Sequence, residues 1–135
     1  VVLSSFNIAR AKARDAQRRQ TLNSVRNALA LYYNVHGFYP TNTGFSPWEN
    51  QPSGTPNWGL GASDGLTILV TEGNIGRIPV DPINREGGAG NYLGDNAPVD
   101  LGYAYVSDGK TYTLGTNLEI GGGVANKWGN YQLKN

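Results

Sequence analysis

Apolar residues recur every three or four positions in the first quarter of the chain, which is the stripe of a helix that packs on a core. The stripe consists of Leu22, Val25, Leu29 and Tyr32 or Tyr33. No proline or glycine interrupts residues 4–33, Gly37 suits a left-handed C-cap, and Pro40 prevents the helix from resuming. The pattern therefore predicts one helix over residues 1–36.

The N-terminal half of this predicted helix has much less to bury. The face that we expect to continue the stripe carries Phe6, Ala9, Ala13 and Ala16. Alanine and arginine favour the helix, but propensity alone leaves a helix of this kind marginal in water. We therefore expect tertiary or intermolecular packing to support it.

Turn-forming residues dominate the chain from 37 to 61, and we expect an ordered surface loop there because it carries two tryptophans. Ser63 or Asp64 can cap a short helix that Gly73 closes. The two prolines in "RIPVDPINREGG" exclude a central strand. Residues 62–100 are therefore predicted to form a short helix and a connector.

Alternation with a period of two residues occurs in "LGYAYVSDGKTYTLGT". Tyr103 and Tyr105 precede, and Tyr112 follows, an Asp-Gly pair, and this combination is a strong signal for a β-hairpin. With one or two further strands, residues 101–135 are predicted to form an antiparallel sheet. The fold class is then α+β, a single domain over residues 1–135 with a long N-terminal helix packed on a small antiparallel sheet.

The predicted core unites the two elements. It consists of Leu22, Val25, Leu29, Tyr103, Tyr105 and Tyr112. We interpret the tyrosines as core and cross-strand packing residues rather than as a platform for a ligand.

Composition agrees with one folded domain, since 39% of the 135 residues are hydrophobic and cysteine is absent. The net charge of +1 hides an asymmetry, because the segment up to His36 contains six basic residues and a single acidic residue, Asp15. Such a basic helix is a solvated face, a surface for a filament or membrane, or a site for nucleic acid. Nucleic acid is disfavoured because the chain has neither a helix-turn-helix nor an aromatic RNA-binding motif.

Catalytic chemistry has little support in the sequence. His36 is the only histidine and is interpreted as a helix-end residue that interacts with terminal carbonyls. The segments "GGAG" and "GGG" lack the strand, lysine and hydroxyl context of a phosphate loop, and the carboxylates form no paired signature. We expect neither an enzyme nor a cofactor.

Three separated segments suggest a family. "AKARDAQRRQTLNSVRNALALYYNVHGFYPT", then "IPVDP", then "YAYVSDGKTYTLGTNLE" follow one another in the order seen in type IV pilins. From Val1 to Glu119 the chain resembles these proteins and, more closely, the major pseudopilin of type II secretion systems. The resemblance implies a pilin-like fold and a preceding apolar membrane segment, of which "VVLSSF" would be the end.

The resemblance also implies a function. The chain would be a structural subunit of a type IV pilus or a pseudopilus, anchored in the inner membrane before it assembles into a periplasmic or cell-surface filament. Its partners would be further copies of itself, other pilins or pseudopilins, and the assembly machinery. The expected filament interface comprises Val1, Leu3, Phe6, Ala9, Arg10, Ala13, Arg14 and Arg18. The alternative is a soluble extracytoplasmic binding module that shares the helix-on-sheet shape.

A metal site needs separate treatment, because major pseudopilins carry calcium in a C-terminal loop rich in acidic ligands. After Glu119 this chain has no Asp or Glu, and asparagines supply only neutral oxygens: Asn117, Asn126 and Asn130. Asp95 and Asp100 could form a different site, but they are more simply turn residues. We therefore expect no metal.

Overall fold

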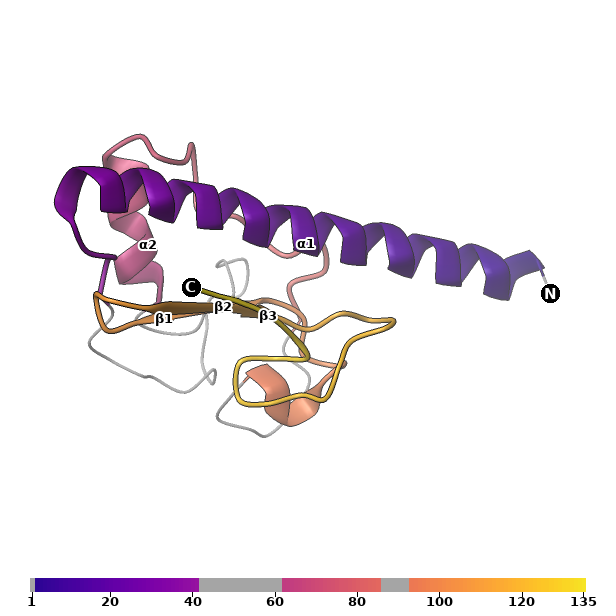
Figure 1. Cartoon of the computed structure of the whole chain (residues 1–135). Coiled ribbons are helices and arrows are strands. Elements are labelled where there is room, and N and C mark those ends of the chain that lie inside the picture. Colours follow the sequence, from indigo (N-terminus) through magenta and orange to yellow (C-terminus); the bar gives the residue numbers. More distant parts are fainter. Residues whose placement is uncertain (1, 42–61, 86–92) are drawn as a thin grey trace.

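A computed structural model gives the fold and describes residues 2–41, 62–85 and 93–135. The helices are α1 (Val2–His36), α2 (Ala62–Thr71) and the 3-10 helix η1 (Leu93–Asn96), and the strands are β1 (Tyr103–Ser107), β2 (Tyr112–Thr116) and β3 (Tyr131–Lys134). Figure 1 shows α1 lying across one face of the sheet and extending well past it at its N-terminal end. The α+β layout, with a long N-terminal helix and a small antiparallel sheet, is confirmed.

Helix α1 ends where the sequence predicts. Gly37 adopts a φ of 76°, which favours glycine, and its N–H donates to the Tyr33 carbonyl at 2.8 Å. Gly73, with a φ of 74°, closes α2 in the same way. Within the described ranges, no helix combines the length and the apolar content required to cross a bilayer.

The three strands form one antiparallel sheet in the order β1-β2-β3. Tyr103 lies opposite Thr116, Ser107 opposite Tyr112, and Leu114 opposite Leu133 of β3. The predicted hairpin is confirmed, and the expected further strand is β3. Because alternate residues share a face, the tyrosines of β1 point to the side on which α1 lies.

The carboxylate of Asp108, on a short side chain, stabilises the hairpin turn. Asp108 Oδ1 accepts the backbone N–H groups of Lys110 at 2.9 Å and Thr111 at 2.7 Å, and Gly109 adopts a φ of 89°. These bonds hold the pKa of Asp108 below its ordinary value, the bond from Thr111 contributing most. The Asp-Gly signal in the sequence thus has a direct structural basis.

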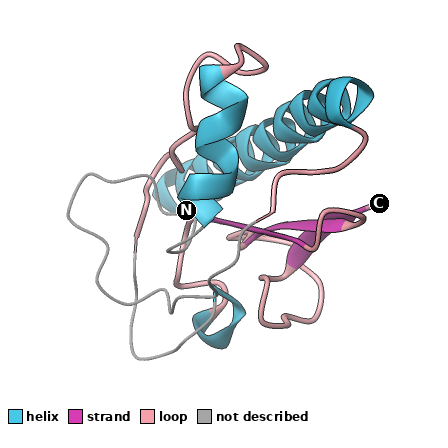
Figure 2. Ribbon diagram, turned by 90° about the vertical axis from the view of Figure 1, so that its left-hand side faces the viewer, coloured by secondary structure: helices cyan, strands magenta, loops and turns pink. Residues whose placement is uncertain are grey.

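The core lies between α1, α2 and the sheet, and Figure 2 shows α2 beside α1. All six predicted core residues belong to one buried cluster, together with Leu66 and Leu69 of α2. Burial raises the pKa of the Tyr103 hydroxyl to about 12, and the Tyr105 hydroxyl donates to the Pro40 carbonyl at 2.6 Å. The tyrosines thus bring their polar ends into the core.

Upstream of Leu22, the docked face of α1 is not the predicted one. Ala11, Asp15 and Arg18 are the buried residues there. The face expected to continue the stripe of Leu22 is exposed, and we call it the outer stripe: Phe6, Ala9, Ala13 and Ala16. The expected continuity was wrong because the six steps from Ala16 to Leu22 turn through about 600°, which leaves the two residues about 120° apart around the helix.

Some predictions fall partly outside the described residues. These are most of the loop at 37–61, the capping side chains of Ser63 and Asp64, and the segment "GGAG". In the described part of the connector, up to Arg85, the chain forms no strand and makes a single antiparallel bridge from Arg85 to Leu101.

Replacing Leu29 with alanine tests the docked face of α1. Leu29 is fully buried, so we expect its truncation to lower the free energy of unfolding by about 2–5 kcal/mol. The matched control is Leu31→Ala, two residues along the same helix, where the side chain is 54% exposed and the expected change is within ~0.5 kcal/mol. Urea unfolding measures both changes. Equal losses of stability in the two variants would show that Leu29 does not lie on the face of α1 that packs on the core.

Candidate functional site

The N-terminal end of α1 projects from the domain. Every residue of Val2–Arg10, which we call the arm, is exposed, and Ala11 is the first buried residue. The large apolar side chains of the arm stand in water, with Leu3 80%, Phe6 56% and Ile8 49% exposed. Figure 1 shows this part of the helix with no described element beside it. The arm is therefore an apolar surface that the described part of the domain leaves uncovered.

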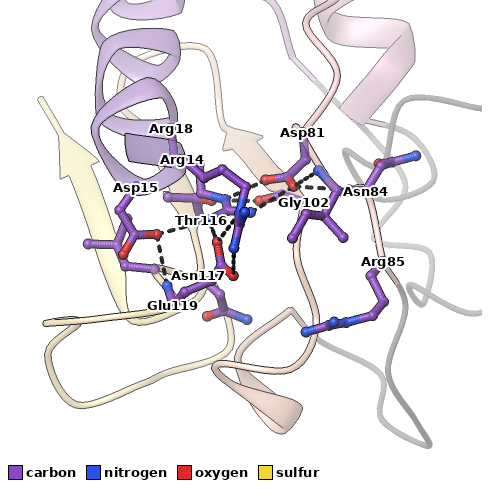
Figure 3. Close-up of polar contacts among 12 residues, drawn as sticks. Arg14, Asp15, Arg18, Asp81, Asn84, Arg85, Gly102, Thr116, Asn117 and Glu119 are labelled. Carbon is purple, nitrogen blue, oxygen red and sulfur yellow. Dashed lines mark hydrogen bonds and ion pairs between the residues drawn. The ribbon is translucent and has the colours of Figure 1, made fainter. Parts of the chain in front are cut away.

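At the base of the arm, the fully buried side chain of Arg18 joins α1 to two distant segments (Figure 3). Its Nε and Nη2 donate to the two carboxylate oxygens of Asp81 at 2.7 and 3.0 Å. Its Nη1 donates to Asp15 at 2.9 Å and to Glu119 at 2.7 Å. Each guanidinium nitrogen is thus paired with a carboxylate, which is the condition for burying this charge.

Arg14 completes the group of charged residues that we call the clasp: Arg14, Asp15, Arg18, Asp81 and Glu119. Arg14 donates to both carboxylate oxygens of Glu119, from Nε at 2.7 Å and from Nη2 at 2.8 Å. Asp15 accepts the backbone N–H groups of Glu119 and Ile120, both at 2.8 Å. The clasp therefore fixes α1 to the segment that follows β2 as well as to the connector.

The sequence around Asp81 explains its position. It lies in "IPVDP", between two prolines that restrict the backbone, and one oxygen also accepts the N–H groups of Ile83 and Asn84 at 2.9 and 3.0 Å. The turn following Asp81 is thus built on the same carboxylate that pairs with Arg18. A rigid turn presents this carboxylate with little entropy to lose.

The charges of the clasp reinforce one another. The hydrogen bond from Arg14 is the main reason that the pKa of Glu119 falls to about 2, against a smaller opposing effect of burial. Burial by itself would lower the pKa of Arg18, but the hydrogen bonds to Asp81 and Glu119 outweigh it and raise that pKa. Arg18 and Glu119 therefore both remain charged at neutral pH.

The structure separates the predicted interface residues into two groups. Those on the arm and the outer stripe are exposed: Leu3, Phe6, Ala9, Arg10 and Ala13. Arg10 lies over the Phe6 ring at 5.2 Å from its centroid. Val1 lies outside the described residues.

The other two predicted interface residues belong to the clasp. Assigning Arg18 to an exposed interface was wrong, because the side chain is buried within its own domain. Arg14 keeps 30% of its side chain exposed but is paired with Glu119 of the same chain. The structural reason is that both face the sheet side of α1, where carboxylates from later segments meet them.

Asp81 and Glu119 were missed as partners. One signal in the sequence pointed to them, since Asp15 and Arg18 extend the stripe that contains Leu22. Charged residues on a docked face require partners, and one aspartate cannot satisfy the five donors of an arginine. The identity of the additional carboxylates was not readable, because they lie 63 and 101 residues further along the chain.

His36 is positioned differently from the prediction. Its Nε2 lies 2.9 Å from Oε2 of Glu72, the residue that follows α2, and its ring stacks on Tyr32 with centroids 4.1 Å apart. It therefore links the ends of two helices rather than binding terminal carbonyls.

The loop after Glu119 is organised by amides. Asn130 donates its N–H to Asn117 Oδ1 at 3.0 Å, and its side chain bonds the N–H and carbonyl of Leu118 at 2.7 and 3.0 Å. Among the described residues, no three His, Cys, Asp or Glu side chains gather as a metal site would require. The side chain of Asp95 lies outside that description, and Asp100 is buried.

Comparison of the chain with protein-family models, with curated proteins and with solved structures gives no match.

Removing the guanidinium of Arg18 should destabilise the domain strongly. Arg18→Met retains much of the side-chain volume but leaves three carboxylates without their shared cation, so we expect a loss of about 3–5 kcal/mol. The matched control is Arg10→Met on the exposed arm, where we expect less than ~1 kcal/mol. Chemical denaturation monitored by circular dichroism measures both. Equal stability of the two variants would contradict the clasp.

The low pKa of Glu119 should make the folded state sensitive to acid. Its folded-state pKa of about 2 lies below the ordinary value of 4.5, so the unfolded chain binds a proton first as the pH falls. The stability from this group is complete above pH 4.5 and is lost as the pH falls from 4.5 towards 2. Urea midpoints measured over this window should fall steeply, and Glu119→Gln should flatten the slope. An unchanged slope in Glu119→Gln would exclude this origin.

Proposed function

We propose that this protein is a non-enzymatic subunit of a helical filament of the type IV pilus or type II secretion pseudopilus kind. The observation that carries the proposal is the arm, a continuous helix whose apolar side chains are exposed ahead of Ala11, the first buried residue of α1. The sequence resemblance to pilins and pseudopilins supports the same reading.

The arm is costly for an isolated domain and useful to a polymer. Exposed apolar area gives about 25 cal/mol per Å² when it is removed from water, and a helix without tertiary support is marginal. Packing of Leu3 and Phe6 against a neighbouring subunit would supply both the burial and the support. A contact between the arm of one subunit and a different surface of the next does not close on itself, so it propagates into a fibre.

The outer stripe is suited to close packing between helices. Ala9, Ala13 and Ala16 present only methyl groups, so a second helix could approach at the short end of the usual 8–10 Å between helix axes. The stripe carries no charge, so such an approach buries no unpaired ion.

The clasp gives the arm a fixed direction. Because Arg18 and Asp15 bind two separate segments of the domain, α1 cannot pivot on the sheet without breaking several charged hydrogen bonds. A regular filament requires each subunit to present its arm at the same angle. In this proposal, the partners are further copies and the assembly machinery, and the filament is periplasmic or on the cell surface after anchoring in the inner membrane.

Ala13→Arg should prevent filament formation in cells that express the full gene, with any residues it encodes before Val1, together with the assembly machinery. The bulky charge would lie on the outer stripe, where we expect a neighbouring subunit. The matched control is Ala30→Arg, the same change at an exposed position of α1 above the sheet. Negative-stain electron microscopy should show filaments for the control alone.

Two outcomes would contradict the proposal. Normal filaments in Ala13→Arg would remove the outer stripe from the interface. A full-length parent protein that never polymerises would overturn the filament itself and favour a soluble binding module. Circular dichroism of both variants establishes that each domain is folded.

A further inference from the structure

Phe6, Ala9 and Ala13 of the outer stripe begin a longer uncharged line that runs along α1 to its C-terminal end. The line continues at intervals of three or four residues, and every member is exposed: Gln17, Gln20, Ser24, Asn27, Leu31 and Val35. At about 100° per residue, all of these positions lie within about 40° of one direction. Large apolar side chains stand only at the two ends of this line.

The apolar side chains at the C-terminal end form what we call the tail patch: Leu31, Val35 and Phe38. They are 54%, 77% and 47% exposed. The Phe38 ring packs against the rings of Tyr32 and His36, with centroids 5.9 and 5.8 Å away, and so stays at the end of the helix. The arm and the tail patch are thus two exposed apolar surfaces at opposite ends of α1 (Figure 1).

Charge distinguishes the tail patch from the middle of α1. Every Arg, Lys and Asp of the helix lies between Arg10 and Arg26, and residues 27–41 contain no Asp, Glu, Lys or Arg. A second copy that presents its basic Arg10 would meet like charges along the middle of the helix but none along its last ten residues. The negative end of the helix dipole and Glu72, 2.9 Å from His36, also favour a basic partner at this end.

We propose that the arm of one subunit packs on the tail patch of the next subunit, with the two α1 helices parallel. The inference rests on the proposed filament and names the surface that receives the arm. With Phe6 beside Leu31, the two helices are displaced by 25 residues, or about 38 Å along the axis. Arg10 then lies level with Val35, and Ala13 lies close to the level of Phe38, so small side chains face large ones.

The lengths of the two surfaces agree with this register. The arm, Val2–Arg10, is about 13 Å long, and residues 27–36 of the receiving helix span about 15 Å. An antiparallel pair would also bring the apolar ends together, but it would place the two basic middle segments side by side. The parallel contact leaves one arm and one tail patch open, so it repeats from subunit to subunit.

Cysteine cross-linking tests the register, because the parent chain contains no cysteine. Phe6→Cys/Leu31→Cys is expressed from the full gene with the assembly machinery, and the filaments are oxidised. The two thiols of one chain are about 38 Å apart on the same helix, so they cannot bond to each other. Bonds between subunits should therefore give a ladder of oligomers on a non-reducing gel. The matched control, Phe6→Cys/Ser24→Cys, has its second thiol about two turns earlier on the same line and should stay monomeric.

The outcomes separate this contact from the filament itself. Filaments that give a ladder with Ser24→Cys in place of Leu31→Cys, or with neither pair, would overturn the register and leave the filament proposal intact. A product that stops at the dimer would indicate the closed antiparallel pair and overturn the parallel contact. A parent protein that forms no filaments would overturn both.

Val35→Arg tests the tail patch without cysteines. Val35 is 77% exposed, so the domain should fold, as circular dichroism would verify, but the new charge would face Arg10 of the neighbour and filaments should be lost. Val35→Arg/Arg10→Glu should restore them. The matched control is again Ala30→Arg, about 140° around the helix from Val35, which should assemble. Normal filaments in Val35→Arg would overturn the tail patch as the receiving surface.

Discussion

Arg18 can be buried only because three carboxylates reach it, and much of the architecture follows from this requirement. An unpaired guanidinium in the interior would cost several kcal/mol, so the helix, the connector and the segment after β2 must all arrive at one point. Asp81 comes from a proline-flanked turn and Glu119 from the end of the β2 segment. The clasp thus fixes the position of α1 relative to the sheet in the part of the helix before Leu22, which lies outside the apolar core.

The two halves of α1 are held by different physics. From Leu22 onward the helix buries leucine, valine and tyrosine against α2 and the sheet, and the hydrophobic effect dominates. Between Ala11 and Arg18 the apolar contribution is small, and directional charged hydrogen bonds replace it. Before Ala11 there is no described support at all. The support of α1 by its own domain thus decreases from the core to the clasp to the arm, and the arm is the part left exposed.

The clasp also determines which charges remain outside. In the clasp, Arg14 and Arg18 are paired with carboxylates of the same chain, so their charges are neutralised locally. Asp15 is bound to Arg18 and to the backbone of Glu119, so it does not pair with the other basic residues of α1. A helix whose sequence looks uniformly basic therefore has an uncharged outer stripe and, on another flank, three exposed or partly exposed basic residues: Lys12, Arg19 and Arg26.

Periodicity in the sequence determined α1, the β1–β2 hairpin and the core, because these depend on local rules: side chains three or four apart share a helix face, alternate side chains share a sheet face, and glycine ends a helix. The same rules place Ala16 and Leu22 on different faces of α1, so the exposure of the alanines also follows from the sequence. Only the tertiary structure decided that Arg18 is buried and that Asp81 and Glu119 are its partners. A charge at a helix position looks the same in sequence whether water or a carboxylate 101 residues away solvates it, and only the folded chain distinguishes the two.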